Sequence, residues 1–231
     1  MTNKTNPVAV ITGASRGLGL ALAEGLARDG WRLVIDARTK DDLAEAAAAL
    51  SELTTVTAIA GDVVDDDHRA DLAQAADHLG GADLLVHNAS TLGGSPPPAL
   101  SGFPLPDLLE TFEVNVLAPI ALTQLLLPQL RQSANGAVLA ISSDAAVEAY
   151  PGWGGYGAAK AALDHASAVL ALEEPRLRVW AVDPGDLRTR LQQEAFPGED
   201  ISDRPLPSTV VPYLLGLLRE RPPSARYRAA R

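Results

Sequence analysis

The chain has 231 residues, of which 47% are hydrophobic and 21% charged, so it holds enough apolar material for one continuous core and extensive disorder is not expected. A formal net charge of −10 would repel phosphate backbones and anionic lipids, which disfavours nucleic acid and membranes as partners and favours a small molecule. Cysteine is absent, which excludes disulfides, thiol catalysis and thiolate metal sites. No run of about 18 apolar residues long enough to cross a bilayer is evident, so a soluble cytoplasmic protein is expected.

The first ninety residues alternate short apolar runs with helical patterns. The expected strands are residues 7–12, 31–37, 54–62 and 82–88. Strands that are apolar on both faces, with helices of about a dozen residues between them, imply parallel pairing through right-handed crossovers. The pattern therefore predicts a doubly wound parallel sheet with helices on both faces.

The rest of the chain continues this alternation without a linker between two composition regimes, so residues 1–231 are expected to form a single domain of six or seven strands. The loops expected on the substrate side are residues 92–104 and 190–206. The expected helices and strands are a long helix over 107–132, strands at 136–143 and 176–185, a last helix over 207–220 despite Pro212, and a candidate seventh strand at 225–228.

A glycine-rich turn joins the first strand to the first helix. Gly13 can adopt positive φ, Gly17 lets the backbone approach a pyrophosphate, and Gly19 permits close packing of helix on strand. The helix N-terminus adds unpaired N–H groups that favour an anion. A turn that merely requires glycine would look similar, and its position between strand and helix is what favours a nucleotide site.

Three polar side chains near the expected fifth strand suggest proton transfer. Tyr156 and Lys160 lie four residues apart, so they share one helical face, and the lysine charge would favour the tyrosine phenolate. Ser143 ends the strand, at the edge where ligands bind in open parallel sheets. A serine that holds a carbonyl and a tyrosine that donates a proton would serve hydride chemistry, whereas a tyrosine and lysine at this spacing could also be surface residues.

Several motifs occur in the order in which one family has them. TGASRGLG (12–19) matches TGxxxGxG, YGAAK (156–160) matches YxxxK, and Ser143 precedes the tyrosine by thirteen residues. HNAS (87–90) is similar to NNAG, and PG at 184–185 precedes a threonine as in PGxxxT. From about Val8 to Thr189 the chain resembles the short-chain dehydrogenase/reductase family, which has a Rossmann-like fold. His87 and Ser90 differ from the residues of the family pattern, and a VDGG-like final strand is not found.

The resemblance implies a set of site residues. The catalytic residues would be Ser143, Tyr156, Lys160 and Asn115. The cofactor-binding residues would be Gly13, Ser15, Arg16, Gly17, Leu18, Gly19, Arg38, Asp62, Val63, Asn88, Ala89, Tyr156, Lys160, Pro184, Gly185, Leu187 and Thr189. Asp65, Asp66 and Asp67 are instead expected to cap a helix.

Asn115 lies four residues before Pro119, which has no N–H to donate to the Asn115 carbonyl. In the family the equivalent carbonyl binds a water that links the lysine to solvent, and the helix is distorted there. The alternative is that the proline only kinks a long helix.

The end of the second strand bears on the choice of cofactor. The position that discriminates NAD from NADP aligns with Ala37, and Arg38 and Arg16 could clasp a 2′-phosphate, which favours NADP(H). Asp36 is one residue away and would favour NAD(H) if the alignment slipped by one.

Further expectations concern the substrate, metals and assembly. Tyr150, Trp153 and Phe196 flank the expected catalytic face, and the histidines His68, His78 and His165 lack metal-ligand spacing, so no metal site is expected. The family implies a homodimer, or a homotetramer. The expected activity is NADP(H)-dependent hydride transfer with a small carbonyl or alcohol substrate. The alternatives are an NADPH-binding sensor without catalysis and a nucleotide-sugar epimerase or dehydratase, which normally needs a larger carboxyl-terminal lobe.

Overall fold

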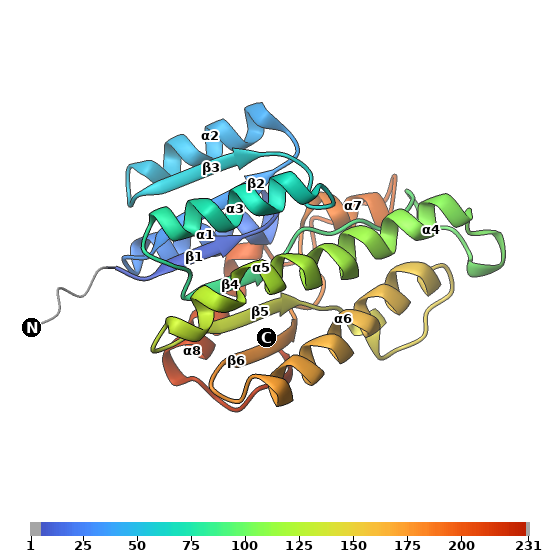
Figure 1. Cartoon of the computed structure of the whole chain (residues 1–231). Helices are drawn as coiled ribbons and strands as arrows, with labels where there is room; N and C mark the ends of the chain where they lie inside the picture. The colour runs from blue at the N-terminus through green and yellow to red at the C-terminus, as the bar shows by residue number, and fades with distance from the viewer. Residues whose placement is uncertain (1–5, 230–231) are drawn as a thin grey trace, which may run out of the picture.

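Seven parallel strands run through the centre of the molecule (Figure 1). The computed structural model describes residues 6–229. The sheet order is β3-β2-β1-β4-β5-β6-β7. The strands are β1 Val8–Ile11, β2 Arg32–Ala37, β3 Val56–Ala60, β4 Leu84–His87, β5 Ala137–Ile141, β6 Arg178–Asp183 and β7 Ala225–Arg228. The doubly wound fold is confirmed, and the candidate seventh strand pairs with β6 in parallel register.

Helices cover both faces of this sheet. They are α1 Gly17–Arg28, α2 Lys40–Ser51, α3 Asp66–His78, α4 Leu105–Phe112, α5 Ala118–Gln132, α6 Gly154–Glu173, α7 Arg190–Ala195 and α8 Val211–Glu220. Alternate strand residues face opposite layers, so Ile11 packs with α1, α2 and α8, whereas Val10 packs with α3 and α5. Because both layers are apolar, the central strands are buried on both faces.

The helix expected over 107–132 is interrupted in the middle. Five residues, Glu113–Leu117, form a π-helical turn between α4 and α5, and the Ala118 N–H donates to the Glu113 carbonyl five residues back. Pro119 lies two residues after this turn, so the missing proline N–H coincides with the irregularity, as the resemblance implied.

The combined helix Leu105–Gln132 corrects one sequence expectation. By length and composition it is apolar enough to span a membrane, whereas no such segment was expected. Half of its most apolar stretch is buried inside the protein, where α5 packs against the sheet with Leu122, Leu126 and Leu130. This burial is that of a core helix.

The chain leaves β1 toward β2 and β3 on one side, and later continues from β4 toward β7 on the other. The loops after β1 and β4 therefore diverge at the carboxyl edge of the sheet. Such a switch point leaves a crevice between them, which is where open α/β sheets bind ligands.

Candidate active site

The glycine turn after β1 is built without room for side chains. Gly13 and Gly17 have φ of 67° and 59°, in the left-handed region that favours glycine. A Cβ on Gly13 would lie 3.0 Å from the Ala89 Cα, and one on Gly19 would lie 2.5 Å from the Asn88 Nδ2. The backbone thus forms a bare cradle at the start of α1, which fits the pyrophosphate of a dinucleotide.

Asn88 and Thr12 hold this turn against the end of β4. The Asn88 amide donates to the carbonyls of Thr12 and Gly13, each at 2.9 Å, and the Thr12 hydroxyl accepts from the N–H groups of Asn88 and Ala89. Asn88 was expected to line the cofactor ribose. It lines the cavity, and its side chain also fixes the shape of the glycine turn.

The Asp36 side chain borders the cavity but is almost completely buried and bound to the glycine turn. Its Oδ1 accepts from the Gly13 N–H at 2.6 Å and its Oδ2 lies 3.0 Å from the His68 Nε2, and both side chains are buried. Burial raises the Asp36 pKa, against the opposing effect of these hydrogen bonds. The Asp36 carboxylate, which left the choice between NAD and NADP open in the sequence, therefore stabilises the glycine turn.

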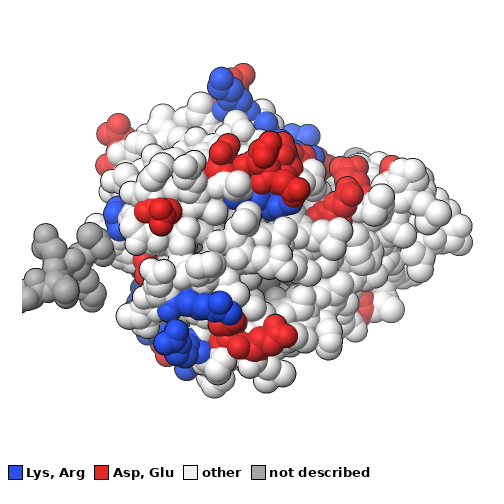
Figure 2. All heavy atoms as spheres, viewed as in Figure 1, with Lys and Arg blue, Asp and Glu red and all other residues white. Residues whose placement is uncertain are grey.

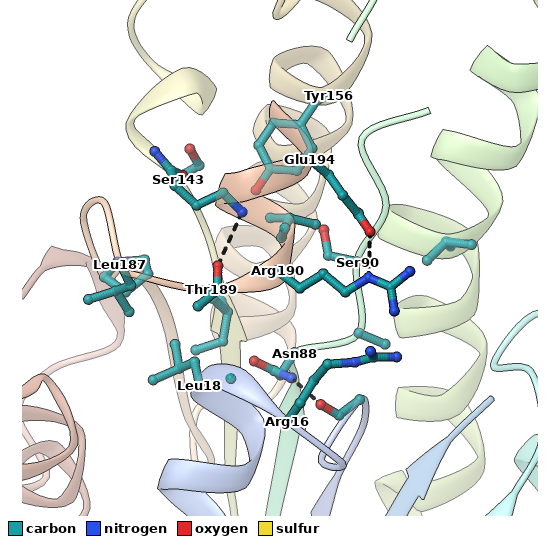
Figure 3. Close-up of a pocket in the computed structure, with 18 of the residues that line it drawn as sticks. Arg16, Leu18, Asn88, Ser90, Ser143, Tyr156, Leu187, Thr189, Arg190 and Glu194 are labelled. Atoms are coloured by element: carbon teal, nitrogen blue, oxygen red, sulfur yellow. Dashed lines mark hydrogen bonds and ion pairs between the residues drawn. The ribbon is translucent and has the colours of Figure 1, made fainter. Parts of the chain in front are cut away.

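Two arginines flank the same end of the cavity. Arg16 and Arg38 both line it, beside Ala37. Arg16 pairs with Asp42 at 3.5 Å, and both side chains are 44% exposed, so screening by water leaves this ion pair weak. The Arg16 guanidinium is therefore available to an anion at the mouth of the cavity (Figure 3).

A single cavity of about 790 Å³ gathers most of the predicted residues. The predicted residues that line it are Gly13, Ser15, Arg16, Gly17, Leu18, Arg38, Asp62, Val63, Asn88, Ala89, Ser143, Tyr156, Lys160, Pro184, Gly185, Leu187 and Thr189. Gly19 and Asn115 do not line it: Gly19 packs behind the glycine turn, and Asn115 is fully buried behind Ser90. Asp65 caps α3 by accepting from the Asp67 N–H, as expected.

Ser143, Tyr156 and Lys160 all line this cavity, and Figure 3 shows Ser143 and Tyr156. Ser143 follows β5 and begins a short turn, where its hydroxyl donates to the Asp144 carboxylate at 3.1 Å. Tyr156 and Lys160 lie on one face of α6 and are almost completely buried. The lysine ammonium lies 5.6 Å from the centre of the tyrosine ring and donates to the Ile141 carbonyl at 2.8 Å.

The pKa values of these groups are shifted mainly by burial. Burial raises the pKa of Tyr156 to about 12, although the Ser90 and Ser143 hydroxyls act to lower it. Burial lowers the pKa of Lys160 to about 8, and the charge of Asp164 opposes that shift. The sequence suggested that Lys160 would lower the Tyr156 pKa, but in the protein alone desolvation of the phenol is the larger effect.

The end of the cavity near Tyr156 is aromatic. Trp153 packs edge-on against Tyr156, with ring centres 5.7 Å apart, and lies 6.0 Å from Phe196. Residues of α7 complete this wall, so the first part of segment 190–206 borders the cavity. Loop 92–104 does not line the cavity: it packs behind the wall, where Ser95 donates to the Glu194 carbonyl.

Comparison with known proteins identifies the family. The family model described as short chain dehydrogenase matches residues 7–200. The chain belongs to the short-chain dehydrogenase/reductase family. An uncharacterised oxidoreductase of Mycobacterium tuberculosis is 38% identical over 186 residues, covering 79% of this chain and 70% of that protein.

Solved structures of similar dehydrogenases share the whole fold. The oxidoreductase yciK from Escherichia coli superposes with a TM-score of 0.90 at 30% identity, covering 98% of this chain and 96% of the other. A short chain dehydrogenase structure from Escherichia coli CFT073, complexed with NADPH, superposes with a TM-score of 0.88 at 30% identity, covering 98% of each chain. The fold and the oxidoreductase family are thus established.

This short-chain dehydrogenase has a positioning arginine that sequence reasoning missed. Arg226, on β7, donates to the Ser143 carbonyl at 2.8 Å and lies 2.9 Å from the Asp164 carboxylate. Asp164 also accepts from the Ser142 hydroxyl and lies one helical turn beyond Lys160. Because Arg226 is 83 residues from Ser143 in sequence, only the pairing of β7 with β6 could reveal the contact.

His87 is another departure from the family pattern. It is buried beneath the site with its Nε2 2.8 Å from the Thr123 hydroxyl, which in turn donates to the Pro119 carbonyl. The threonine proton is thus committed, so the His87 Nε2 carries the hydrogen. Burial and the nearby Lys160 charge lower the His87 pKa to about 3. Among residues 6–229, no group of three His, Asp or Glu side chains is arranged to hold a metal.

His87 should make the fold sensitive to acid. A histidine whose pKa is lower in the folded than in the unfolded state stabilises the fold fully above its unfolded pKa of about 6.5, and that contribution is lost as the pH falls toward 3. Between pH 7 and 5 the loss should reach about 2 kcal/mol. Urea unfolding of wild type and His87→Asn at both pH values checks this. The variant should lose about 2 kcal/mol less than wild type, and equal losses would refute the account of His87.

Proposed function

We propose that this protein is an NADP(H)-dependent oxidoreductase that interconverts a small carbonyl compound and its alcohol, with Tyr156 as the proton donor and acceptor. The observation that carries the proposal is the meeting of Ser143, Tyr156 and Lys160 in the same cavity as the glycine cradle. NADPH, when bound, supplies the hydride.

The protein's own groups would do the rest of the chemistry. Ser143 turns its hydroxyl from Asp144 to the substrate carbonyl, and Tyr156 donates a second hydrogen bond and then its proton to the forming alkoxide. A phenol with a raised pKa stays protonated near neutral pH, which suits reduction. In alcohol oxidation the phenolate is the base, and Lys160 and the positive charge of an oxidised nicotinamide would favour it. Lys160 would also bind the ribose.

The geometry of the cavity supports NADP(H). Asp36 is engaged by the glycine turn, so no free carboxylate occupies the discriminating position, and Arg16 and Arg38 face the same mouth. The NADPH complex of the similar Escherichia coli CFT073 protein agrees with this assignment. NAD(H) remains the alternative cofactor if the two arginines do not engage a phosphate.

The substrate end favours a neutral or apolar carbonyl compound. Trp153, Leu191 and Phe196 provide apolar walls, whereas Asp144 and Glu194 also line the cavity and would repel an anionic substrate. Glu194 is paired with Arg190 at 2.7 Å, whereas Asp144 accepts from the Ser143 hydroxyl at 3.1 Å.

The assembly proposed is a homodimer, or a homotetramer, through α4, α5 and α6. Leu105, Leu109 and Leu117 expose more than half of their surface on the outer side of the α4–α5 segment, as does Leu172 on α6. Figure 2 shows few charged side chains over α4 and α6. A surface of this kind is typical of the contact between subunits.

The test is NADPH consumption by the purified protein with ketones, aldehydes, quinones and pterins. We expect turnover with at least one neutral class and none without added carbonyl compound. Tight NADPH binding together with failure on every class would instead support a sensor that catalyses nothing.

A further inference from the structure

Ser90 lies at the reacting end of the cavity, where the family pattern has glycine. It follows β4, lines the cavity with Tyr156 and Ser143, and is partly buried (Figure 3). A glycine in this place would present no hydroxyl, so the side chain is a feature of this chain that the general family mechanism does not use.

The Asn115 amide determines where the Ser90 proton points. The Asn115 Nδ2 donates to the carbonyls of Thr91 and Thr111, at 2.8 and 2.9 Å. Both partners are acceptors only, so the amide orientation is fixed and its Oδ1 must face donors. The Ser90 hydroxyl donates to that Oδ1 at 2.6 Å, and the Thr91 N–H lies 3.3 Å from it.

A hydroxyl that donates to Asn115 still has its lone pairs free toward the cavity. It can therefore accept a hydrogen bond from a protonated Tyr156, and after rotation it can donate one to an ionised Tyr156. A donor near the phenolate is consistent with the lowering of the Tyr156 pKa by the Ser90 and Ser143 hydroxyls.

We propose that Ser90 is a positioning residue for Tyr156, with a hydroxyl that donates to Asn115 while the phenol is protonated and rotates to donate to the phenolate when Tyr156 is ionised. The rotation exchanges a hydrogen bond to a neutral amide for one to an ion, which is the stronger of the two. Ser90 thereby favours the phenolate and promotes alcohol oxidation. This inference rests on the proposed role of Tyr156.

The charged groups that face Tyr156 come from four elements, and a change at Ser90 leaves all of them in place. Asp144 follows β5 and Asp183 ends β6, and both raise the Tyr156 pKa. Lys160 lies on α6 beside the ring, and Glu194 lies on α7, paired with Arg190. A shift on removal of the Ser90 hydroxyl would therefore report that hydroxyl.

The direct test follows the ionisation of Tyr156 in the NADP⁺ complex by NMR, with carbon-13 at the tyrosine Cζ. The chain has four tyrosines, and Tyr156→Phe identifies the signal. Ser90→Ala should raise the apparent Tyr156 pKa by about 0.5 to 1 pH unit. Ser90→Thr, which keeps a hydroxyl, should restore the wild-type value, and Ser51→Ala, which removes an exposed hydroxyl on α2, should leave it unchanged.

Two results would overturn the proposal: a Tyr156 pKa in Ser90→Ala no higher than in wild type, or no ionisation of Tyr156 over the pH range in which the wild-type complex stays folded.

Kinetics give a second readout. Ser90→Ala should move the pH at which alcohol oxidation rises to higher values with little change in the plateau kcat. A purely structural role would lower kcat equally at every pH. The proposed function fails separately, if Tyr156→Phe keeps full activity, because the pKa measurement does not require turnover.

Discussion

Replacing Tyr156 by phenylalanine should lower kcat for carbonyl reduction by about 10²- to 10⁴-fold, the range that general acid catalysis typically contributes. The phenyl ring keeps the packing against Trp153, so the variant should fold and should still bind NADPH. Steady-state kinetics with the best substrate, together with NADPH titration of the variant, measure both quantities.

The pH dependence of the wild type follows from the same group. Because burial raises the Tyr156 pKa, the phenol should stay protonated through neutral pH, so reduction should be nearly constant there and oxidation should rise as the pH increases. Tyr213→Phe is the matched control, since Tyr213 lies on α8 outside the cavity. Full carbonyl reduction by Tyr156→Phe with NADPH still bound would refute the assigned role.

Exchanging the side chains at the end of β2 should reverse the choice of cofactor. Arg38→Ala should weaken NADPH binding by about 10- to 100-fold and leave NADH nearly unchanged, because only the 2′-phosphate would lose a charged hydrogen bond. Adding Ala37→Asp to it should favour NADH, since a carboxylate there would bond the ribose 2′-hydroxyl and repel the phosphate.

Isothermal titration with both cofactors measures these changes. Arg28→Ala serves as the control, because Arg28 is an exposed arginine on α1 paired only with Glu24. Equal loss of NADPH and NADH affinity in Arg38→Ala would contradict the phosphate clasp.

The sheet could be predicted from local sequence patterns because its central strands are apolar on both faces and therefore appear as continuous apolar runs. Strands β1 to β6 are somewhat shorter than the apolar runs that predicted them, since the last residues of a run, such as Thr12 and Asn88, turn out of the sheet to build the site. Residues 225–228 could be predicted only as a candidate strand, because the sequence ARYR has few apolar residues. Its place in the sheet depends on pairing with β6.

The site was predictable where motifs are local and unpredictable where distant segments meet. The glycine turn and the Tyr156–Lys160 pair follow from short spacings. The inward direction of Asp36 depends on His68, 32 residues away, and the Ser90–Asn115 contact spans 25 residues. Loop 92–104 was expected to flank the catalytic face and either to close over a ligand or to pack, and its side of the aromatic wall depends on distant contacts such as that of Ser95 with Glu194.

The most direct test of hydride transfer uses NADPH that carries deuterium at the hydride-donating carbon of its nicotinamide. With the best carbonyl substrate, mass spectrometry should find one deuterium on the carbon of the new alcohol formed by the wild type. Product formation without deuterium, or NADPH binding without transfer to any carbonyl class tested, would contradict the proposed activity.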